Sequence, residues 1–139
     1  MNSLSASAIP GVEVYQVKKI ASAAGVFTKP LVNNFIKGFY EDGFGEVYTI
    51  IFPPGSKRGG HYHKKSTEFF CVIQGCAKLY LSDGEQNQEI EMNGINPVTV
   101  RIPSGVMHTI DNVGNENVVL IVYWNKSYSD DDRDTYTTA

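Results

Sequence analysis

Closely spaced turn signals divide most of this chain into short segments with the patterns of β-strands. Glu46–Phe52 (EVYTIIF) and Val118–Trp124 (VVLIVYW) are rich in β-branched and aromatic residues, and residues 76–81 (CAKLYL) alternate between apolar and polar. The turn signals between the segments are Pro53-Pro54-Gly55, Gln74-Gly75, Ser82-Asp83-Gly84, Asn93-Gly94, Pro103-Ser104-Gly105 and Asn112-Val113-Gly114-Asn115. Strands broken by turns about every 8–12 residues, without a clear amphipathic helix, predict an all-β sandwich or barrel.

The remaining segments complete an expected single domain over residues 1–139, a length that suits one hydrophobic core. Further strands are expected at residues 12–17, 59–63, 68–73, 88–92, 97–102 and 107–111. Residues 21–27 suggest a turn into a short strand, and residues 31–40 fit a helical turn or an irregular strand equally well. Residues 1–9 are expected to form an N-terminal arm, and residues 127–139 a polar, acidic tail.

Composition excludes several classes of function. The net charge of −3 argues against a general nucleic-acid-binding protein. No apolar run approaches the roughly 20 residues that span a bilayer, and the N-terminus lacks the basic and apolar regions of a signal peptide. The two cysteines, Cys71 and Cys76, are too few and too close for a disulfide framework and are expected to be reduced thiols. These features predict a cytoplasmic protein without membrane or nucleic-acid partners.

All three histidines of the chain lie in two short motifs that also contain a glutamate. His61 and His63 are two residues apart on an expected strand, so their side chains share one face. Glu68 begins the next strand, and His108 follows a Pro-x-Gly turn. Three imidazole nitrogens and one carboxylate suit a divalent transition metal such as Zn, Fe, Mn, Co or Ni. A lone histidine is more often a surface or hydrogen-bonded core residue, but this clustering favours a metal site with open positions for water or substrate.

The spacing of these residues resembles the cupin superfamily. Gly55-x5-His61-x-His63-x4-Glu68-x6-Gly75 resembles the first cupin motif, and Pro103-x-Gly105-x2-His108-x3-Asn112 resembles the second. The glycine that usually opens the second motif six residues before the proline is displaced or absent, since the nearest candidate, Gly94, precedes Pro103 by nine. The resemblance implies a jelly-roll barrel, the double-stranded β-helix, with His61, His63, Glu68 and His108 as metal ligands.

Two further stretches narrow the resemblance within the cupins. Ile9-Pro10-Gly11-Val12, with Arg58-Gly59-Gly60-His61-Tyr62, is similar to the deoxysugar-nucleotide epimerases of the dTDP-4-dehydrorhamnose 3,5-epimerase type. The stretch GSKRGGHYHKK also resembles sugar 3,4-ketoisomerases. The HYH run, the PxGxxH motif and Asp132-Arg133-Asp134-Thr135-Tyr136 resemble the carboxy-terminal cupin of capsular polysaccharide reductase/epimerases.

These resemblances imply an epimerase or ketoisomerase that acts on a 4-keto-6-deoxy sugar nucleotide in polysaccharide or deoxysugar biosynthesis. A base removes the proton next to the ketone, and an acid returns it. In the metal-free epimerases the residue matching His61 is the base, whereas the presence here of both His63 and Glu68 favours a metal. His61 is therefore expected to be a ligand or the base, and Tyr128 or else Tyr123 the acid.

Substrate binding and assembly are also expected from the resemblance. Arg58 and Lys64 are candidates to bind the diphosphate of a nucleoside-diphosphate sugar, because a guanidinium can clamp phosphate oxygens. Small cupins commonly pair through an edge strand, which implies a homodimer. Two alternatives remain: a metal-dependent cupin dioxygenase, and a non-catalytic cupin that binds a sugar or another small molecule.

Overall fold

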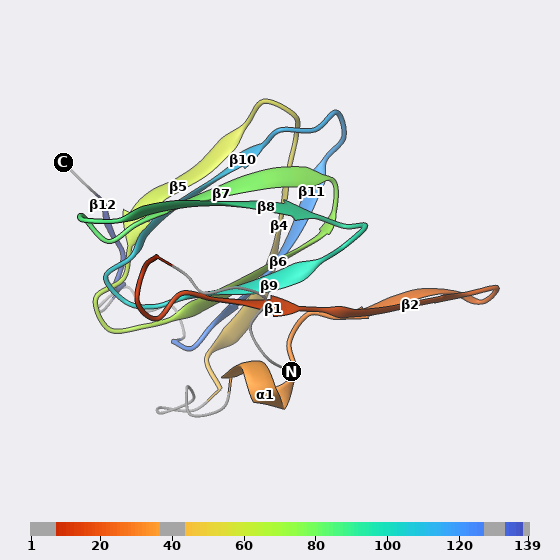
Figure 1. Ribbon diagram of the computed structural model, residues 1–139, viewed down its shortest axis with the longest axis horizontal. Helices are drawn as coiled ribbons and strands as arrows, with labels where there is room; N and C mark the ends of the chain where they lie inside the picture. Colours follow the sequence, from red (N-terminus) through yellow and green to blue (C-terminus); the bar gives the residue numbers. More distant parts are fainter. Residues whose placement is uncertain (1–7, 37–43, 127–132, 138–139) are drawn as a thin grey trace.

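Two antiparallel sheets face each other in the computed structural model, which describes residues 8–36, 44–126 and 133–137 (Figure 1). The first sheet has the order β1 (Glu13–Gln16), β9 (Val98–Ile102), β6 (Glu68–Gln74), β11 (Val118–Trp124) and β4 (Glu46–Phe52). The second has the order β12 (Tyr136–Thr137), β5 (Lys57–Tyr62), β10 (Met107–Asn112), β7 (Cys76–Ser82) and β8 (Asn87–Asn93). The expected all-β jelly roll is confirmed.

Side-chain parity along the strands decides what lies between the sheets. On β6, Phe70 and Val72 enter the main core, whereas Phe69 and Cys71 lie in a second cluster on the other side. On β11, Val118, Leu120 and Val122 enter the main core for the same reason, because successive strand residues point to opposite faces. At one end of the barrel, the strand positions that face the interior are occupied by polar residues instead of apolar ones.

The second cluster covers the outer face of the first sheet. The short helix α1 (Asn33–Ile36) contributes Phe35, whose ring stacks on Tyr15 at a centroid distance of 4.6 Å. Tyr123 is buried in this cluster, and its hydroxyl donates a hydrogen bond to the carbonyl of Phe44. The helical alternative for residues 31–40 therefore holds for 33–36. No described helix has the length and hydrophobicity needed to cross a bilayer.

Three local expectations are incomplete. Residues 18–29 form a projecting hairpin, β2 (Lys18–Ser22) and β3 (Gly25–Lys29), of which the sequence predicts only the second strand (Figure 1). Ile9, assigned to the arm, is 1% exposed because it packs into the main core. In the expected polar tail, Asp134 is 2% exposed and β12 pairs with β5.

Cys71 is buried and Cys76 exposed, and neither forms a disulfide.

Candidate functional site

The registers of the strands bring the polar residues to one end of the barrel interior. His61 on β5 pairs with His108 on β10, and Glu68 on β6 pairs with Trp124 on β11. His63 follows directly after β5. One ligand-type atom from each of His61, His63, Glu68 and His108 lies within 4.8 Å of the others. The structure therefore brings together all four residues that the two motifs supply.

The backbones of β5 and β10 come close together at Gly59, and this contact sets how far apart in space the two motifs lie. Gly59 has a φ of +111°, and a Cβ atom at this position would lie 2.5 Å from the carbonyl oxygen of His108. Any larger residue would push β10 away from β5. The glycine before the histidine pair is therefore required to place His108 beside His61, with their ring centroids 4.6 Å apart.

Hydrogen bonds fix how two of the imidazoles are oriented. The Nδ1 atom of His63 donates to the backbone carbonyl of Asp134 at 2.7 Å, and Nδ1 of His108 donates to that of Val106 at 3.1 Å. Because carbonyls only accept, both rings keep their protons on Nδ1 and turn Nε2 towards Glu68. The Nε2 atom of His63 contacts Glu68 Oε1.

The Nε2 atom of His108 is the clearest sign of what this cluster could bind. It lies 3.1 Å from Glu68 Oε1, yet it is buried and makes no hydrogen bond. Two imidazole nitrogens thus face one carboxylate oxygen, an arrangement that a cation would satisfy once both nitrogens are deprotonated. Metal-bound histidines usually donate their other ring N–H to a carbonyl or carboxylate, as both do here. The donor set fits a divalent transition metal.

The electrostatics of the cluster favour an ionised glutamate. Burial would raise the pKa of Glu68, but the neighbouring imidazoles of His108 and His63 outweigh burial and hold that pKa well below its usual range. Although burial lowers the pKa of His63, its contact with the Glu68 carboxylate produces a net increase. Burial, followed by the charge of His108, lowers the pKa of His61 to about 4. His61 is therefore neutral at neutral pH and can act as a ligand or a base.

A cleft of about 380 Å³ opens onto three of the four residues, His61, His63 and Glu68, and its lining also includes Glu46, Tyr48, Trp124 and Thr135. The Tyr48 hydroxyl donates to Glu68 Oε2 at 2.9 Å, and burial together with the Glu68 charge raises the pKa of this phenol. Sequence reasoning missed Tyr48, although the alternation of β4 was a usable signal. It places Tyr48 on the same face as Phe52, which enters the main core.

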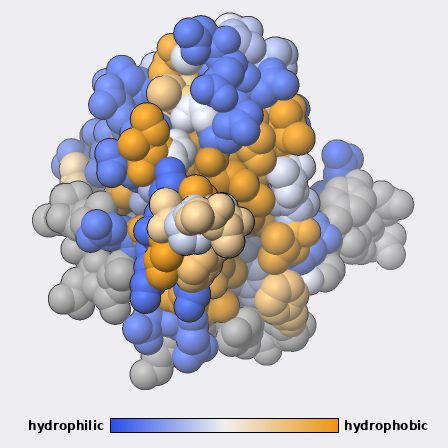
Figure 2. All heavy atoms as spheres, turned by 90° about the vertical axis from the view of Figure 1, so that its right-hand side faces the viewer, coloured by the Kyte–Doolittle hydropathy of each residue, from blue (hydrophilic) through white to orange (hydrophobic). Residues whose placement is uncertain are grey.

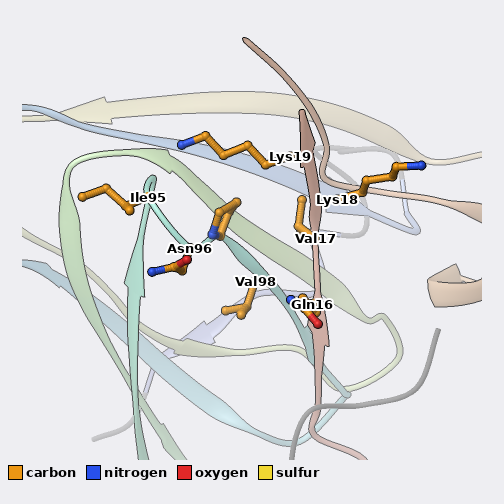
Figure 3. A pocket seen from close by; sticks show the side chains of 8 residues that line it. Gln16, Val17, Lys18, Lys19, Ile95, Asn96 and Val98 are labelled. Carbon is orange, nitrogen blue, oxygen red and sulfur yellow. The ribbon is translucent and has the colours of Figure 1, made fainter. Parts of the chain in front are cut away.

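A larger hollow, of about 590 Å³, lies at the base of the β2–β3 hairpin (Figure 3). Its lining includes Lys18, Lys19 and Asn96, but none of the residues of the two motifs. Lys19 Nζ is occupied by a hydrogen bond to the Gly94 carbonyl at 2.6 Å. We place the candidate site at the smaller cleft, because the residues able to do acid–base or metal chemistry converge there.

The other expected site residues have different outcomes. Tyr123 points away from the histidines, because it alternates with Trp124 along β11, so its geometry does not suit an acid in this cleft. Tyr128 lies outside the described residues. Arg58 is exposed on β5, and its charge is one of the contributions that lower the pKa of His61. Lys64 places Nζ 4.2 Å from the ring centroid of Tyr136.

Residues 33–136 match the family described as the polysaccharide biosynthesis C-terminal domain. The chain belongs to this family. A curated relative is the UDP-2-acetamido-2,6-beta-L-arabino-hexul-4-ose reductase of Pseudomonas aeruginosa, 36% identical over 88 residues, which are 62% of this chain and 24% of the reductase. The chain thus spans about a quarter of that relative. The spore coat polysaccharide biosynthesis protein SpsL of Bacillus subtilis is 25% identical over 135 residues, 91% of this chain and 86% of SpsL.

Solved structures of similar shape confirm the cupin fold expected for this family member. The capsular polysaccharide assembling protein CapF of Staphylococcus aureus has a TM-score of 0.66 and 25% identity, over 87% of this chain and 34% of CapF. ChmJ, a 3'-monoepimerase from Streptomyces bikiniensis crystallised with dTDP-quinovose, has a TM-score of 0.81, 15% identity and coverages of 99% and 73%. QdtA, a sugar 3,4-ketoisomerase from Thermoanaerobacterium thermosaccharolyticum crystallised with TDP, has a TM-score of 0.76, 23% identity and coverages of 94% and 90%.

Proposed function

We propose that this protein is an epimerase or ketoisomerase of a 4-keto-6-deoxy sugar nucleotide in polysaccharide biosynthesis. The observation that carries the proposal is the convergence of four residues, His61, His63, Glu68 and His108, of which the first three line a cleft that also contains a phenol. This combination supplies a neutral imidazole, a cation site and a proton donor within one small volume. Isomerisation next to a ketone requires a base and a proton donor, gains from a group that stabilises the enolate oxygen, and needs no oxidant or reductant.

The comparisons support the substrate class. The family is defined by polysaccharide biosynthesis, and the curated reductase is named for a UDP-linked hexul-4-ose. Proteins of similar fold are a 3'-monoepimerase and a 3,4-ketoisomerase, both crystallised with thymidine nucleotides or their sugars. We therefore propose a nucleoside-diphosphate sugar as the substrate. The exposed guanidinium of Arg58 is our candidate to receive the diphosphate.

The proposed reaction begins with the removal of one proton from carbon. A base takes the proton from the carbon next to the ketone, and the carbonyl becomes an enolate. Return of a proton to the opposite face of the same carbon restores the ketone and gives the epimer. For the ketone to shift by one position, that carbon must carry a hydroxyl: the O–H proton passes to the former carbonyl oxygen, and a proton is added to the former carbonyl carbon. Each proton removed is matched by a proton returned, so the atoms balance in both cases.

We assign the base to His61, the least buried of the four residues and one that lines the cleft. Tyr48 is the tyrosine that the described part of the chain places in this cleft, so we assign it the acid. Tyr128 remains a prediction for the same role. Because Tyr48 donates to Glu68, its proton is held towards the cluster, and a neutral phenol is ready to donate at neutral pH.

We propose that His63, Glu68 and His108 hold a divalent transition metal such as Zn, Ni, Fe or Mn. When bound, such an ion supplies Lewis-acid stabilisation of negative charge on the substrate oxygen. The alternative is that His61 is a fourth ligand. The metal content of His61→Gln decides between the two: retained metal with lost proton exchange assigns the base, and lost metal assigns the ligand.

The test is solvent exchange. The protein is incubated in D₂O with UDP- and dTDP-linked 4-keto-6-deoxy sugars, and deuterium at the carbon next to the ketone is followed by NMR. Exchange should be reduced in Tyr48→Phe and retained in the matched control Tyr80→Phe, because Tyr80 on β7 is not among the residues that line the cleft. Absence of exchange with every such nucleotide sugar, in metal-loaded protein, would refute the proposal. Oxygen uptake with a small organic substrate would instead favour the dioxygenase alternative, and ligand binding without turnover the non-catalytic one.

We also propose that the protein is a homodimer. Every residue of β2 and most of β3 is exposed, including Ile20, Val26 and Phe27. Figure 2 views the molecule from the side of this hairpin and shows hydrophobic atoms gathered around it. An isolated two-stranded hairpin is marginally stable in water, so a partner surface would stabilise it. Sedimentation should give a dimer that Phe27→Glu weakens, and a monomeric wild type would refute this assembly.

A further inference from the structure

Asp134 has two features that are unusual for a residue in a polar C-terminal stretch. It is 2% exposed, and its φ of +46° is the only positive φ of a non-glycine residue in the described ranges. A buried aspartate is rare without partners, and a left-handed backbone is uncommon for side chains other than Asn and Asp. Both features indicate that the surrounding structure holds this residue in place.

The backbone and the side chain of Asp134 bind to consecutive parts of one turn. The backbone carbonyl accepts the hydrogen bond from Nδ1 of His63 at 2.7 Å. The carboxylate accepts from the backbone amide of Lys64 at 3.0 Å, from that of Lys65 at 3.1 Å and from the Ser66 hydroxyl at 2.6 Å. One residue therefore binds three of the four residues that connect His63 to β6, which begins at Glu68.

The same network reaches the wall of the cleft. The Ser66 hydroxyl accepts a hydrogen bond from Nε1 of Trp124 at 2.8 Å, and the Trp124 ring lies 5.4 Å from the His63 ring, centroid to centroid. On the other side, β12 pairs with β5, with Tyr136 opposite Tyr62 and Thr137 opposite His61. The C-terminal segment 133–137 is therefore attached to the histidine pair through both sheet pairing and Asp134.

We propose that Asp134 is a positioning residue for the histidine cluster, which fixes the tautomer and orientation of His63 by presenting its carbonyl to Nδ1 while its carboxylate fastens the turn at residues 64–66. The inference deepens the proposed metal-dependent function, because it requires that Nε2 of His63 be the atom that binds. A carbonyl held by a strained backbone and three hydrogen bonds can keep Nδ1 protonated, which leaves the Nε2 lone pair directed at the site. Asp134 does not line the cleft and is not assigned contact with the substrate.

The charge of Asp134 is consistent with this role. Burial would raise the pKa of the carboxyl, but hydrogen bonds from Ser66, Lys64 and Lys65 outweigh burial and lower it. The carboxylate is therefore ionised over the neutral pH range. An ionised acceptor makes stronger hydrogen bonds to the turn than a neutral amide would.

Three substitutions separate the parts of the proposal. Asp134→Gly keeps the left-handed backbone and removes the carboxylate, whereas Asp134→Asn keeps an oxygen acceptor without the charge. The matched control is Asp83→Gly, because the Asp83 carboxylate also accepts two backbone amides, from Glu85 and Gln86, in an exposed turn that does not line the cleft. Circular dichroism and thermal melts identify a temperature at which each variant is folded.

The first readout is zinc affinity, measured by competition with a chelating dye. Loss of a residue that orients a metal-binding histidine typically weakens affinity about 10–100-fold, so we expect that loss in Asp134→Gly, a smaller one in Asp134→Asn and none in Asp83→Gly. The second readout is the Nδ1 proton of His63 in ¹⁵N-labelled, zinc-loaded protein, one of only three histidines to assign. It should exchange slowly in the wild type and rapidly in Asp134→Gly.

Unchanged zinc affinity, or an unchanged His63 Nδ1 proton, in Asp134→Gly would overturn the inference. Should that variant fail to fold, Asp134→Asn decides by the same two measurements. A wild-type protein that binds no divalent metal would refute the metal-dependent function on its own. The Asp134 role would then be judged in metal-free protein, where the hydrogen bond from His63 Nδ1 must still weaken in Asp134→Gly for the inference to stand.

Discussion

Replacing Gly59 with alanine should damage both the stability and the metal affinity of this protein, and Gly60→Ala is its internal control. Both glycines have positive φ, +111° for Gly59 and +79° for Gly60. A Cβ at Gly60 meets nothing within 4 Å, whereas a Cβ at Gly59 would lie 2.5 Å from His108 O and 3.0 Å from Thr109 Cα. The two variants therefore share the backbone strain and differ in the clash.

The magnitude follows from these contacts. Each alanine forced into an unfavourable φ costs about 1–3 kcal/mol. Gly59→Ala adds a clash with backbone atoms, which cannot rotate away, at a further cost of about 1–3 kcal/mol. To restore an ordinary contact of 3.4 Å, β10 must move by about 0.9 Å at His108. Metal–ligand distances are held to about 0.2 Å, so such a shift would disrupt the ligand set.

Urea denaturation of the metal-free variants measures the free energy of unfolding, and zinc titration measures the metal affinity. We expect Gly59→Ala to lose more stability than Gly60→Ala and to bind zinc more weakly. The same free energy of unfolding and the same zinc affinity in both variants would show that the close approach of β5 and β10 does not set the geometry of the site.

Three further predictions concern the cluster itself. His108→Ala should lower bound metal and proton exchange together, because it removes a buried nitrogen that faces Glu68, and full metal occupancy by elemental analysis would contradict this ligand assignment. Tyr48→Phe should cost about 1 kcal/mol of stability. This is less than the roughly 1.5–3 kcal/mol of a hydrogen bond to a charged group, because Tyr48 is 36% exposed, and the metal should be retained. An exchange rate equal to that of the wild type would remove Tyr48 as the acid. Because the pKa of His61 is lowered to about 4 from 6.5, the unfolded chain binds more protons than the folded one between these values, so stability should fall as pH falls from 6.5 to 4. His61→Gln should make that decline less steep in urea titrations at several pH values, and an unchanged slope would contradict the shift.

Features that depend on residues close in sequence follow from the sequence alone. Strand alternation and turn chemistry act locally, and the strands Glu46–Phe52 and Val118–Trp124 agree with expectation at both ends. His61 and His63 had to share a face because they are two apart on an extended chain. The cupin spacing then tied His108 to them, and the structure explains the motif's final residue: Asn112 is buried and donates to the carbonyls of Phe52 and Glu116.

The alternation of side chains along each strand could also have shown which tyrosines face the barrel interior. Tyr123 lies between Val122 and Trp124 on β11, so it had to face away from whichever side Trp124 occupies. Tyr48 stands two residues from Ile50 and four from Phe52, on the interior face of β4. What parity could not supply was the end of the barrel at which each strand begins, because that depends on how distant strands pair.

Local sequence thus determined the strands, their inward faces and the four chemically distinctive residues of the two motifs. Tertiary structure alone decided that Tyr48 reaches Glu68 and that Asp134 leaves a polar C-terminal stretch to hold His63. The physical reason is the range of the forces involved. Alternation follows from the geometry of neighbouring residues, whereas the carbonyl of Asp134 meets an imidazole 71 positions earlier only after the sheets have closed and sheet pairing has carried the C-terminal segment to β5.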